Sequence, residues 1–500
     1  MEALLKRAAD LIRTRVDYTF ILVLLFYKRI SDKWRVEFEQ AYREALADGL
    51  SEEEARQEAE SSIFHEFDIP RGFLWDDIRR GDPARLHERF SEAMRRIGEL
   101  NPDLRVVFDN VDFMQFAQSQ ENVEILRQLV ELFSAKPLYD VSPDVLGDAY
   151  EWVLRYFAPQ KAKEGEILTP REVIRLLVEV LDPRGGESVY DPACGTGGML
   201  ILSYKYVEDV YGPDDAERLF LYGQDANPKI LALARMNTYI HDILNVNLVV
   251  GDTLLYPKFK EDGDVKRFDV VLANPPLNQD GYAEDVLKRG DFWRERFRFG
   301  FPPGSSADWA WIQHMLYSAK DDNGRVGVVI DNGCLFRGGS EKAVRSQVVE
   351  HDYIDAVILL PEKLFYNTGA PGVVLVLRKS KPEERRGRIL FINASNEFEK
   401  HPEVRKLNRL GDGNIERIVR AYREYRDVEG FAKVVPLDEV KGNEYNLNVT
   451  LYVMPVEEGE EIDIAREYQE LKQLEQQIQE ASKKMDGYLS EIIRVVQHEG

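Results

Sequence analysis

Short apolar runs recur between residues 187 and 378, and most are separated by segments with helical spacing. Buried parallel strands read as continuous apolar runs, and their alternation with helices is typical of a doubly wound α/β sheet. No other feature constrains the fold as strongly. The predicted strands are Ser188–Asp191, Leu219–Asp225, Leu248–Gly251, Phe268–Ala273, Arg325–Ile330, Ile354–Leu360 and Val373–Arg378.

The last two predicted strands are joined by residues 361–372, which are rich in glycine, proline and asparagine. This connection is too short and irregular for the helical crossover that parallel strands require. We therefore expect an antiparallel hairpin at the edge of the sheet.

Two further regions flank the α/β domain, to which we assign residues 141–455. Residues 1–140 have a mostly helical pattern, and the apolar run Phe20 to Tyr27 predicts a buried helix in a helical domain. Residues 456–500 predict an amphipathic helix with coiled-coil spacing, which docks on a partner or folds back on its own domain. Its heptad positions are Ile464, Leu471, Ile478, Met485 and Ile492, with Leu474, Ala481 and Tyr488 in the alternating register.

The composition limits the possible partners. The net charge is −23, whereas a protein that binds DNA unaided usually presents a basic surface. The two cysteines, Cys194 and Cys334, fit a reducing compartment, and no Cys/His spacing predicts a metal site. The apolar run near the amino terminus is shorter than the about 20 residues that span a membrane. We therefore expect a cytoplasmic protein that has no metal and no membrane contact.

One local exception to the acidic balance lies at residues 288–299. Basic residues interleaved with aromatic side chains are a candidate contact for nucleic acid, and a solvated charged loop is the alternative. The residues of this stretch are Lys288, Arg289, Arg294, Arg296 and Arg298, with Phe292, Trp293, Phe297 and Phe299.

The tetrapeptide Asn274-Pro275-Pro276-Leu277 directly follows a predicted strand. Prolines fix φ and present carbonyls without N–H donors, so the Asn274 oxygen and a neighbouring carbonyl can form a rigid pair of acceptors. Such a pair suits a planar exocyclic amine, as on adenine, because holding its hydrogens favours attack on an electrophilic methyl group. An ordinary strand-to-loop turn is the alternative.

Polar groups also follow the three preceding predicted strands. A glycine-rich loop, Asp191–Gly198, follows the first and opens a helix, while Asp225 and Asp252 stand at the ends of the next two. These strand ends meet at one edge, where doubly wound sheets bind ligands. Asp225 is placed to accept from ribose hydroxyls, and the acidic loop suits a cationic ligand. S-adenosylmethionine, with its sulfonium and adenosine, is the cofactor that we expect.

A predicted helix begins shortly before the first strand, within Glu166–Glu172. Its pattern predicts Thr169 as the N-cap, Pro170 at the first helical position and Glu172 completing a capping box. A helix N-terminus also binds carboxylates, so this segment is a candidate to hold the amino-acid end of the cofactor.

With these residues assembled, the chain closely resembles the modification (methyltransferase) subunits of Type I restriction–modification systems, which methylate adenine N6 in DNA. The resemblance covers almost the whole chain. Its motifs lie, in this order, at residues 26–32, 148–154, 167–171, 191–200, 274–277, 307–314, 332–339 and 364–369.

The resemblance implies a role for each site residue. Asn274 and the Pro275 carbonyl hold the target amine, followed by Pro276 and Leu277, after the base has left the helix stack. The family usually has an aromatic residue in place of Leu277, and Phe292, Trp293, Phe299 and Phe301 are the candidates to stack on the base. The residues implied to contact S-adenosylmethionine are Glu166, Ile167, Leu168, Thr169, Pro170, Arg171, Thr196, Gly197, Gly198 and Asp225, in a pocket shaped by Asp191, Gly195 and Asp252.

The resemblance also implies partners: DNA, a specificity subunit that chooses the sequence, and a second copy of this chain. It leaves open whether a restriction subunit joins. The segment after Leu277 is too short for a target-recognition domain, which agrees with a separate specificity subunit. The alternatives are a self-sufficient methyltransferase acting on DNA, RNA or a protein amide, and a non-catalytic assembly subunit.

Overall fold

The computed structural model describes residues 2–12, 16–109, 111–163, 168–366, 368–402, 404–454, 468–469 and 471–485. The chain divides into two compact units, Met1–Met454 and Pro455–Gly500. In the second unit, residues 471–485 are helical, and the apolar side chains of Leu471, Leu474, Ile478 and Met485 are all more than half exposed. The heptad positions Ile464, Tyr488 and Ile492 lie outside the described residues.

The amino-terminal region is helical, as predicted. Every residue of the run Phe20 to Tyr27 lies in α2 and is at most 3% exposed. A helix that is apolar on all sides must be surrounded by other elements, and α1, α5, α6, α7 and α8 share one core with α2. The helices of this region are α1 (Glu2–Ile12), α2 (Thr19–Ala47), α3 (Glu52–Ala59), α4 (Trp75–Arg79), α5 (Leu86–Leu100), α6 (Pro102–Phe108), α7 (Gln120–Ser134) and α8 (Pro143–Lys163).

A nine-stranded sheet forms the centre of the α/β region, with the order β13-β10-β8-β9-β7-β6-β1-β2-β3. All predicted strands are present, with ends that differ by no more than two residues. Strands β9 and β13 run opposite to the others. The strands of this sheet are β1 (Ser188–Asp191), β2 (Phe220–Asp225), β3 (Val246–Val250), β6 (Val270–Ala273), β7 (Arg325–Asp331), β8 (Ile354–Leu359), β9 (Gly372–Arg378), β10 (Arg388–Asn393) and β13 (Ala432–Pro436).

The predicted hairpin of β8 and β9 is antiparallel, but it does not lie at the edge of the sheet. Strand β9 is inserted between β7 and β8, and β10 and β13 extend the sheet beyond β8. The prediction missed these last two strands. Residues 389–392 of β10 are fully buried, because a neighbouring strand lies on each side and helices cover both faces.

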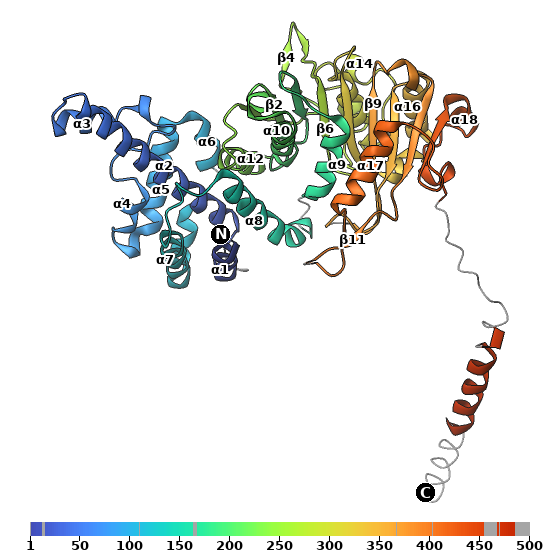
Figure 1. The fold of residues 1–500 in the computed structure, drawn as a ribbon, viewed down its shortest axis with the longest axis horizontal. Coiled ribbons are helices and arrows are strands. Elements are labelled where there is room, and N and C mark those ends of the chain that lie inside the picture. The colour runs from blue at the N-terminus through green and yellow to red at the C-terminus, as the bar shows by residue number, and fades with distance from the viewer. Residues whose placement is uncertain are drawn as a thin grey trace, which may run out of the picture. The chain divides into compact units, whose positions relative to one another are not determined.

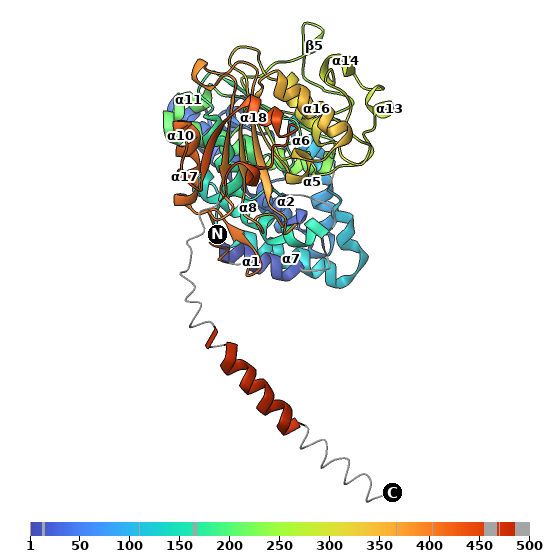
Figure 2. The same cartoon turned by 90° about the vertical axis from the view of Figure 1, so that its right-hand side faces the viewer.

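Helices cover both faces of the sheet (Figures 1 and 2). Apolar residues of α9, α10 and α17 pack on one face, and those of α15, α16 and α18 pack on the other. Within the residues that the structure describes, no helix is both long enough and apolar enough to cross a membrane. The helices of this region are α9 (Arg171–Leu181), α10 (Gly198–Tyr211), α11 (Pro213–Glu217), α12 (Pro228–Ile240), α13 (Glu284–Leu287), α14 (Trp293–Arg296), α15 (Asp308–Tyr317), α16 (Gly339–Glu350), α17 (Asp412–Glu424) and α18 (Leu437–Gly442).

Helix α12 connects the helical region with the sheet. Its residues Leu233, Met236 and Ile240 belong to the core of the amino-terminal helices, whereas Leu231 and Ala234 pack with the sheet. The hydroxyl of Tyr150 in α8 also donates to the Leu233 carbonyl at 2.9 Å. One helix therefore fixes the helical region against the edge of the sheet at which β2 ends.

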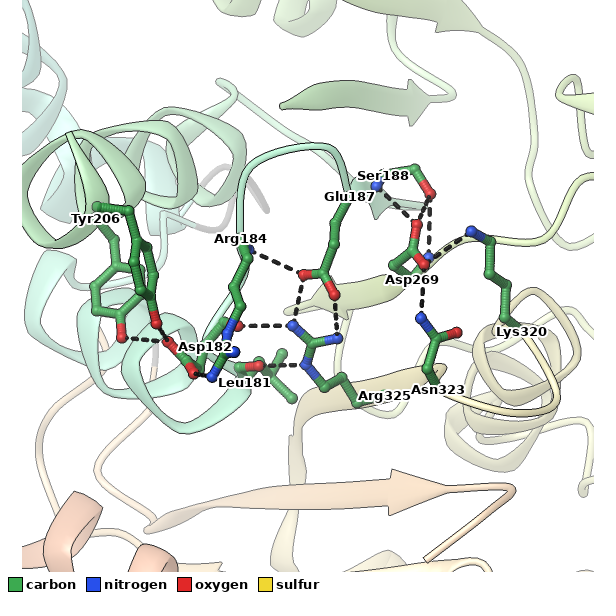
Figure 3. Close-up of polar contacts among 11 residues, drawn as sticks. Leu181, Asp182, Arg184, Glu187, Ser188, Tyr206, Asp269, Lys320, Asn323 and Arg325 are labelled. Atoms are coloured by element: carbon green, nitrogen blue, oxygen red, sulfur yellow. Dashed lines mark hydrogen bonds and ion pairs between the residues drawn. The ribbon is translucent and has the colours of Figure 1, made fainter. Parts of the chain in front are cut away.

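A polar cluster connects the amino-terminal ends of β1, β6 and β7, on the side of the sheet opposite to the carboxyl ends of these strands (Figure 3). Arg325 donates to both carboxylate oxygens of Glu187, at 2.9 and 2.6 Å, and to the carbonyls of Leu181 and Asp182. Because the last carbonyls of a helix have no intrahelical partner, the guanidinium caps the end of α9 while it anchors β7.

We expect Arg325→Leu to destabilise the protein by about 3 kcal/mol, because it removes the charged partner of the Glu187 carboxylate, which retains the Arg184 N–H, and the donor to two helix-end carbonyls. The measurement is the urea midpoint of unfolding. Arg184→Leu is the matched control: its pair with Asp182 is 64% exposed on the arginine side and should contribute less than about 1 kcal/mol. Equal losses for the two variants would contradict this interpretation.

Candidate active site at the carboxyl ends of the strands

A cavity of about 280 Å³ lies at the carboxyl ends of β1, β2 and β6, where the chain leaves β1 between strands on either side. This is the switch point at which doubly wound sheets bind ligands. The volume is close to the lower end of the roughly 300–1,000 Å³ of small-molecule sites. The predicted site residues that line it are Leu168, Gly195, Thr196, Asp225, Asp252, Asn274 and Pro276.

The glycine-rich loop turns at the end of β1. Gly195 and Gly197 have φ values of 52° and 82°, a region in which other residues are strained. The Gly195 N–H donates to Asp225 Oδ2 at 3.0 Å, which ties the loop to the end of β2. Gly198 begins α10, so the loop leads directly into a helix N-terminus, as predicted from the sequence.

Asp191 stabilises this loop through a hydrogen bond within it and does not line the cavity. Its side chain is 1% exposed and accepts from the Ala193 N–H at 3.0 Å. Burial raises the pKa of Asp191 to about 8; the Ala193 N–H opposes the rise and the nearby Asp225 adds to it. Burial thus favours the protonated form of the Asp191 carboxyl in the folded chain.

Asp225 and Asp252 face the cavity from neighbouring strand ends. Asp225 accepts from the N–H groups of Gly195 and Asn227, yet burial outweighs these donors and raises its pKa. Asp252 accepts from the Leu255 N–H and from the Tyr282 hydroxyl, at 3.1 and 2.9 Å. The pocket thus presents two carboxylates that could accept from hydroxyl or amino groups of a ligand.

The acceptor tetrapeptide follows β6 directly. Asn274 donates from Nδ2 to Thr169 Oγ1 at 2.8 Å. Its Oδ1 atom is buried and has no hydrogen-bond partner within the described part of the chain. A buried acceptor without a donor is costly, and such atoms in a native fold call for an explanation. The free oxygen fits a donor brought by a ligand. Pro275 is buried beside it, and Leu277 is partly exposed outside the cavity lining.

The segment before α9 differs from the predicted cap. Helix α9 begins at Arg171 with Pro170 as its N-cap residue and no side-chain cap, so the predicted capping box of Thr169 and Glu172 is wrong. The Thr169 hydroxyl instead receives the Asn274 amide. A contact between residues 105 apart in the chain carries no local sequence signal, whereas a capping box does.

The other predicted residues of the segment 166–172 do not all line the main cavity. Arg171 forms ion pairs with Asp148 and Glu151 of α8, at 2.6 and 3.1 Å. Thr169, Arg171 and Gly198 line a smaller cavity of about 30 Å³ that shares Leu168 and Thr196 with the main one. Glu166 and Ile167 lie outside the described residues.

Several residues that line the cavity were not predicted from the sequence. Tyr18, Leu154 and Ala158 come from the helical region, and the Tyr18 ring stacks on Phe157 at 5.2 Å. Nothing in the sequence around Tyr18 indicates that it reaches a strand end of another domain. Of the remaining lining residues, Pro192 and Ala193 belong to the predicted glycine-rich loop and Trp311 to the motif at 307–314, whereas Ala226, Asn227, Ile230, Thr253, Gln279 and Tyr282 were not predicted.

The four aromatic residues considered for base stacking do not line this cavity. Trp293 packs against Phe301, with ring centroids 6.1 Å apart, and Phe299 packs against His351. The ring of Phe292 lies beneath the Lys260 ammonium group. The aromatic rings that line the cavity belong to Tyr18, Tyr282 and Trp311.

The basic stretch at residues 288–299 does not form a continuous positively charged surface. Arg296 is 1% exposed and donates to the carbonyls of Thr253 and Leu254 at 3.1 and 2.7 Å. Burial lowers its pKa to about 10. Lys288 and Arg289 pair with the acidic residues four positions earlier. Arg296 thus supports the cavity wall, whereas Lys288, Arg289, Arg294 and Arg298 are exposed, the first two of them within ion pairs.

The raised pKa of Asp191 predicts a pH dependence of stability. An ordinary aspartate titrates near 3.9 when unfolded, so the stability from the protonated carboxyl is complete below about pH 4 and is lost as the pH rises toward 8. We expect the free energy of unfolding of Asp191→Asn, relative to that of the wild type, to increase by at least about 1 kcal/mol when the pH is raised from 5 to 8. Urea midpoints at both pH values measure this, and parallel pH profiles would contradict it.

Comparisons with known proteins agree with this geometry. The N-6 DNA Methylase family model matches residues 141–461, and the HsdM N-terminal domain model matches residues 1–133. The methylase subunits of the Type I restriction enzymes MjaVII and MjaVIII of Methanocaldococcus jannaschii are 46% and 44% identical, each over 98% of this chain and 84% of the relative.

A solved structure shares both the fold and the length. The methyltransferase subunit of the type I restriction-modification system from Streptococcus thermophilus superimposes with a TM-score of 0.77 at 27% identity, over 90% of this chain and 98% of that one. With a family model that covers most of the chain and relatives that match almost all of it, the chain belongs to the N-6 DNA methylase family of adenine-specific DNA methyltransferases, together with the methylase subunits of Type I restriction enzymes.

Proposed function

We propose that this chain transfers a methyl group from S-adenosylmethionine to adenine N6 in DNA, as the modification subunit of a Type I complex. A separate specificity subunit chooses the DNA sequence. The observation that carries the proposal is the Asn274 amide: its nitrogen is engaged by Thr169, and its buried oxygen has no donor among the described residues.

The orientation of this amide matters for the chemistry. Because Thr169 Oγ1 holds Nδ2, the amide presents its oxygen, an acceptor, toward the ligand rather than its NH₂ group. An exocyclic amine supplies the missing donor. With the Pro275 carbonyl as a second acceptor, the amine hydrogens are held and the nitrogen lone pair is directed at the methyl carbon. One amine hydrogen then leaves as a proton.

The rest of the cavity fits S-adenosylmethionine. When bound, this cofactor supplies an electrophilic methyl group on a sulfonium. Asp225 and Asp252 are placed to accept from its hydroxyl and amino groups, and the apolar walls of Leu154, Ala158 and Ile230 exclude water. The N-terminus of α10 follows the loop and favours a carboxylate. These residues bind and orient the cofactor.

A separate specificity subunit is supported by charge and by an exposed helix. Residues 277–300 contain as many acidic as basic residues, so the loop nearest to the acceptor offers little net attraction for phosphates. The apolar side chains of Leu471, Leu474 and Ile478 are exposed at coiled-coil spacing. We propose that this helix docks on the specificity subunit, which also joins this chain to DNA and to a second copy of itself.

We expect Asn274→Ala to lower kcat for DNA methylation at least about 100-fold, as removal of a preorganised transition-state contact usually does. The binding of S-adenosylmethionine, measured by calorimetry, should change little. The assay uses the complex with its specificity subunit and follows transfer of a labelled methyl group to adenine.

Asn323→Ala is the matched control for this variant. Asn323 donates to Asp269 at the opposite edge of the sheet (Figure 3), so its loss should leave methylation unchanged. If Asn274→Ala methylated DNA as fast as the wild type, the proposed role of the acceptor would be wrong.

We expect Leu277→Tyr to raise kcat/KM for DNA about fivefold or more, because stacking of an aromatic ring on a base contributes about 1–3 kcal/mol. Leu277→Met, which adds no ring, is the control and should leave kcat/KM unchanged. A tyrosine variant no better than wild type would show that another ring already supports the flipped base.

A further inference from the structure

The loop beyond the acceptor tetrapeptide turns through a strained residue. Asn278 has a φ of 50°, and a left-handed conformation costs a non-glycine residue about 1–2 kcal/mol, although asparagine tolerates it better than most. Two hydrogen bonds oppose relaxation. The Asn278 N–H donates to Asp308 Oδ1 at 3.0 Å, and the Ala307 N–H donates to the Gln279 carbonyl at 2.8 Å. The loop is thus attached to the beginning of α15.

One arginine touches both sides of this attachment. Arg337 donates from Nη2 to the Asn278 side-chain oxygen at 3.0 Å and lies 3.2 Å from Asp308 Oδ2. Asp308 therefore holds the Asn278 backbone with one oxygen and Arg337 with the other. Arg337 lies in the motif at residues 332–339, for which the proposed chemistry gives no role.

Two further carboxylates fix the direction of the guanidinium. Arg337 Nε lies 2.6 Å from Glu341 Oε2, and Nη1 lies 2.9 Å from Asp331 Oδ2. The side chains of Asp308 and Glu341 are 1% and 3% exposed. Three carboxylates at different angles use three nitrogens of one planar group, an arrangement that a lysine cannot reproduce. The hydrogen bond to Glu341, against the effect of burial, helps to raise the pKa of Arg337, which stays charged.

The tetrapeptide transmits the position of Asn278 to Asn274. Pro275 and Pro276 have φ fixed by their rings, so Leu277 is the one residue between the two asparagines with both backbone dihedrals free. A movement at Asn278 is therefore passed on to the Asn274 amide. Displacement of a reacting group by about 1 Å lowers a rate by roughly 100-fold.

We propose that Arg337 is a positioning residue for methyl transfer: it clamps Asn278 to Asp308 and thereby fixes the direction of the Asn274 acceptor. The inference rests on the proposed function of Asn274. It assigns to the motif at 332–339 a role in the geometry of the acceptor rather than in binding the cofactor.

The test compares Arg337→Gln, Arg337→Lys and Asn278→Ala in the full chain with its specificity subunit. We expect Arg337→Gln to lower kcat about 10- to 100-fold, with the Kd for S-adenosylmethionine within about twofold of wild type. Arg337→Lys should recover a minor part of kcat. The double variant with Asn278→Ala should lose no more than Arg337→Gln alone, because both remove the same contact.

A second readout does not depend on catalysis. Hydrogen exchange of the amides at residues 277–279 should be faster in Arg337→Gln, while amides of β1 and β6 keep their protection. Arg426→Gln is the matched control: that arginine is 69% exposed and pairs with Glu424 at the end of α17, outside the acceptor loop and the basic stretch. Its kcat and exchange rates should equal those of the wild type.

The outcomes separate the two proposals. Unchanged kcat in Arg337→Gln, multiplicative losses in the double variant, or equal losses of kcat and cofactor affinity would each overturn the positioning role. Unfolding of Arg337→Gln would leave Asn278→Ala, which alters an exposed side chain, to decide by the same kcat and exchange measurements. If the wild-type complex did not methylate DNA, the proposed function would fail, and the exchange rates would still show whether Arg337 holds the loop.

Discussion

The parallel pairing of β1 with β2 on one side and β6 on the other is the constraint on which the site depends. It brings the glycine loop, Asp225 and Asn274 to one edge of the sheet, although they are far apart in the chain. The polar cluster around Asp269 and Arg325 secures the other ends of the same strands (Figure 3). These strands are thus held at both ends, by ionic and polar contacts at the edge away from the cavity and by the glycine loop and its hydrogen bond to Asp225 at the other.

The sequence predicted the parts of this arrangement that are encoded locally. Buried strands are continuous apolar runs, and the polar residues that end them are read directly, so β1, β2, β3 and β6 and their terminal side chains were found. Strands β10 and β13 were missed because one is a short apolar run with charged neighbours and the other pairs at the sheet edge. Contacts between distant segments, such as Thr169 with Asn274 and Arg296 with the Thr253 carbonyl, leave no periodic signal.

The charge distribution supports the proposed division between a cofactor site on this chain and a DNA contact shared with another subunit. A pocket with Asp225 and Asp252 at its wall favours a cationic ligand, and the overall charge of −23 extends that preference. The same charge repels phosphates. Of the basic residues near the acceptor, Arg296 is buried and Lys288 and Arg289 are paired with carboxylates. Arg294 and Arg298 are exposed, but acidic and basic residues balance over 277–300, so under the proposed function another subunit supplies most of the attraction for DNA.

The helical region also takes part in the site. Tyr18, Leu154 and Ala158 form one wall of the cavity, and α12 packs with the core of the helical region on one side and with the sheet on the other. Any displacement of the helical region against the sheet would therefore change the volume beside Asn274. Because Ile230 at the start of α12 lines the same cavity, docking of the two regions and the shape of the cavity depend on one set of contacts. A partner that binds the helical region thus has a direct physical route to the rate of methyl transfer.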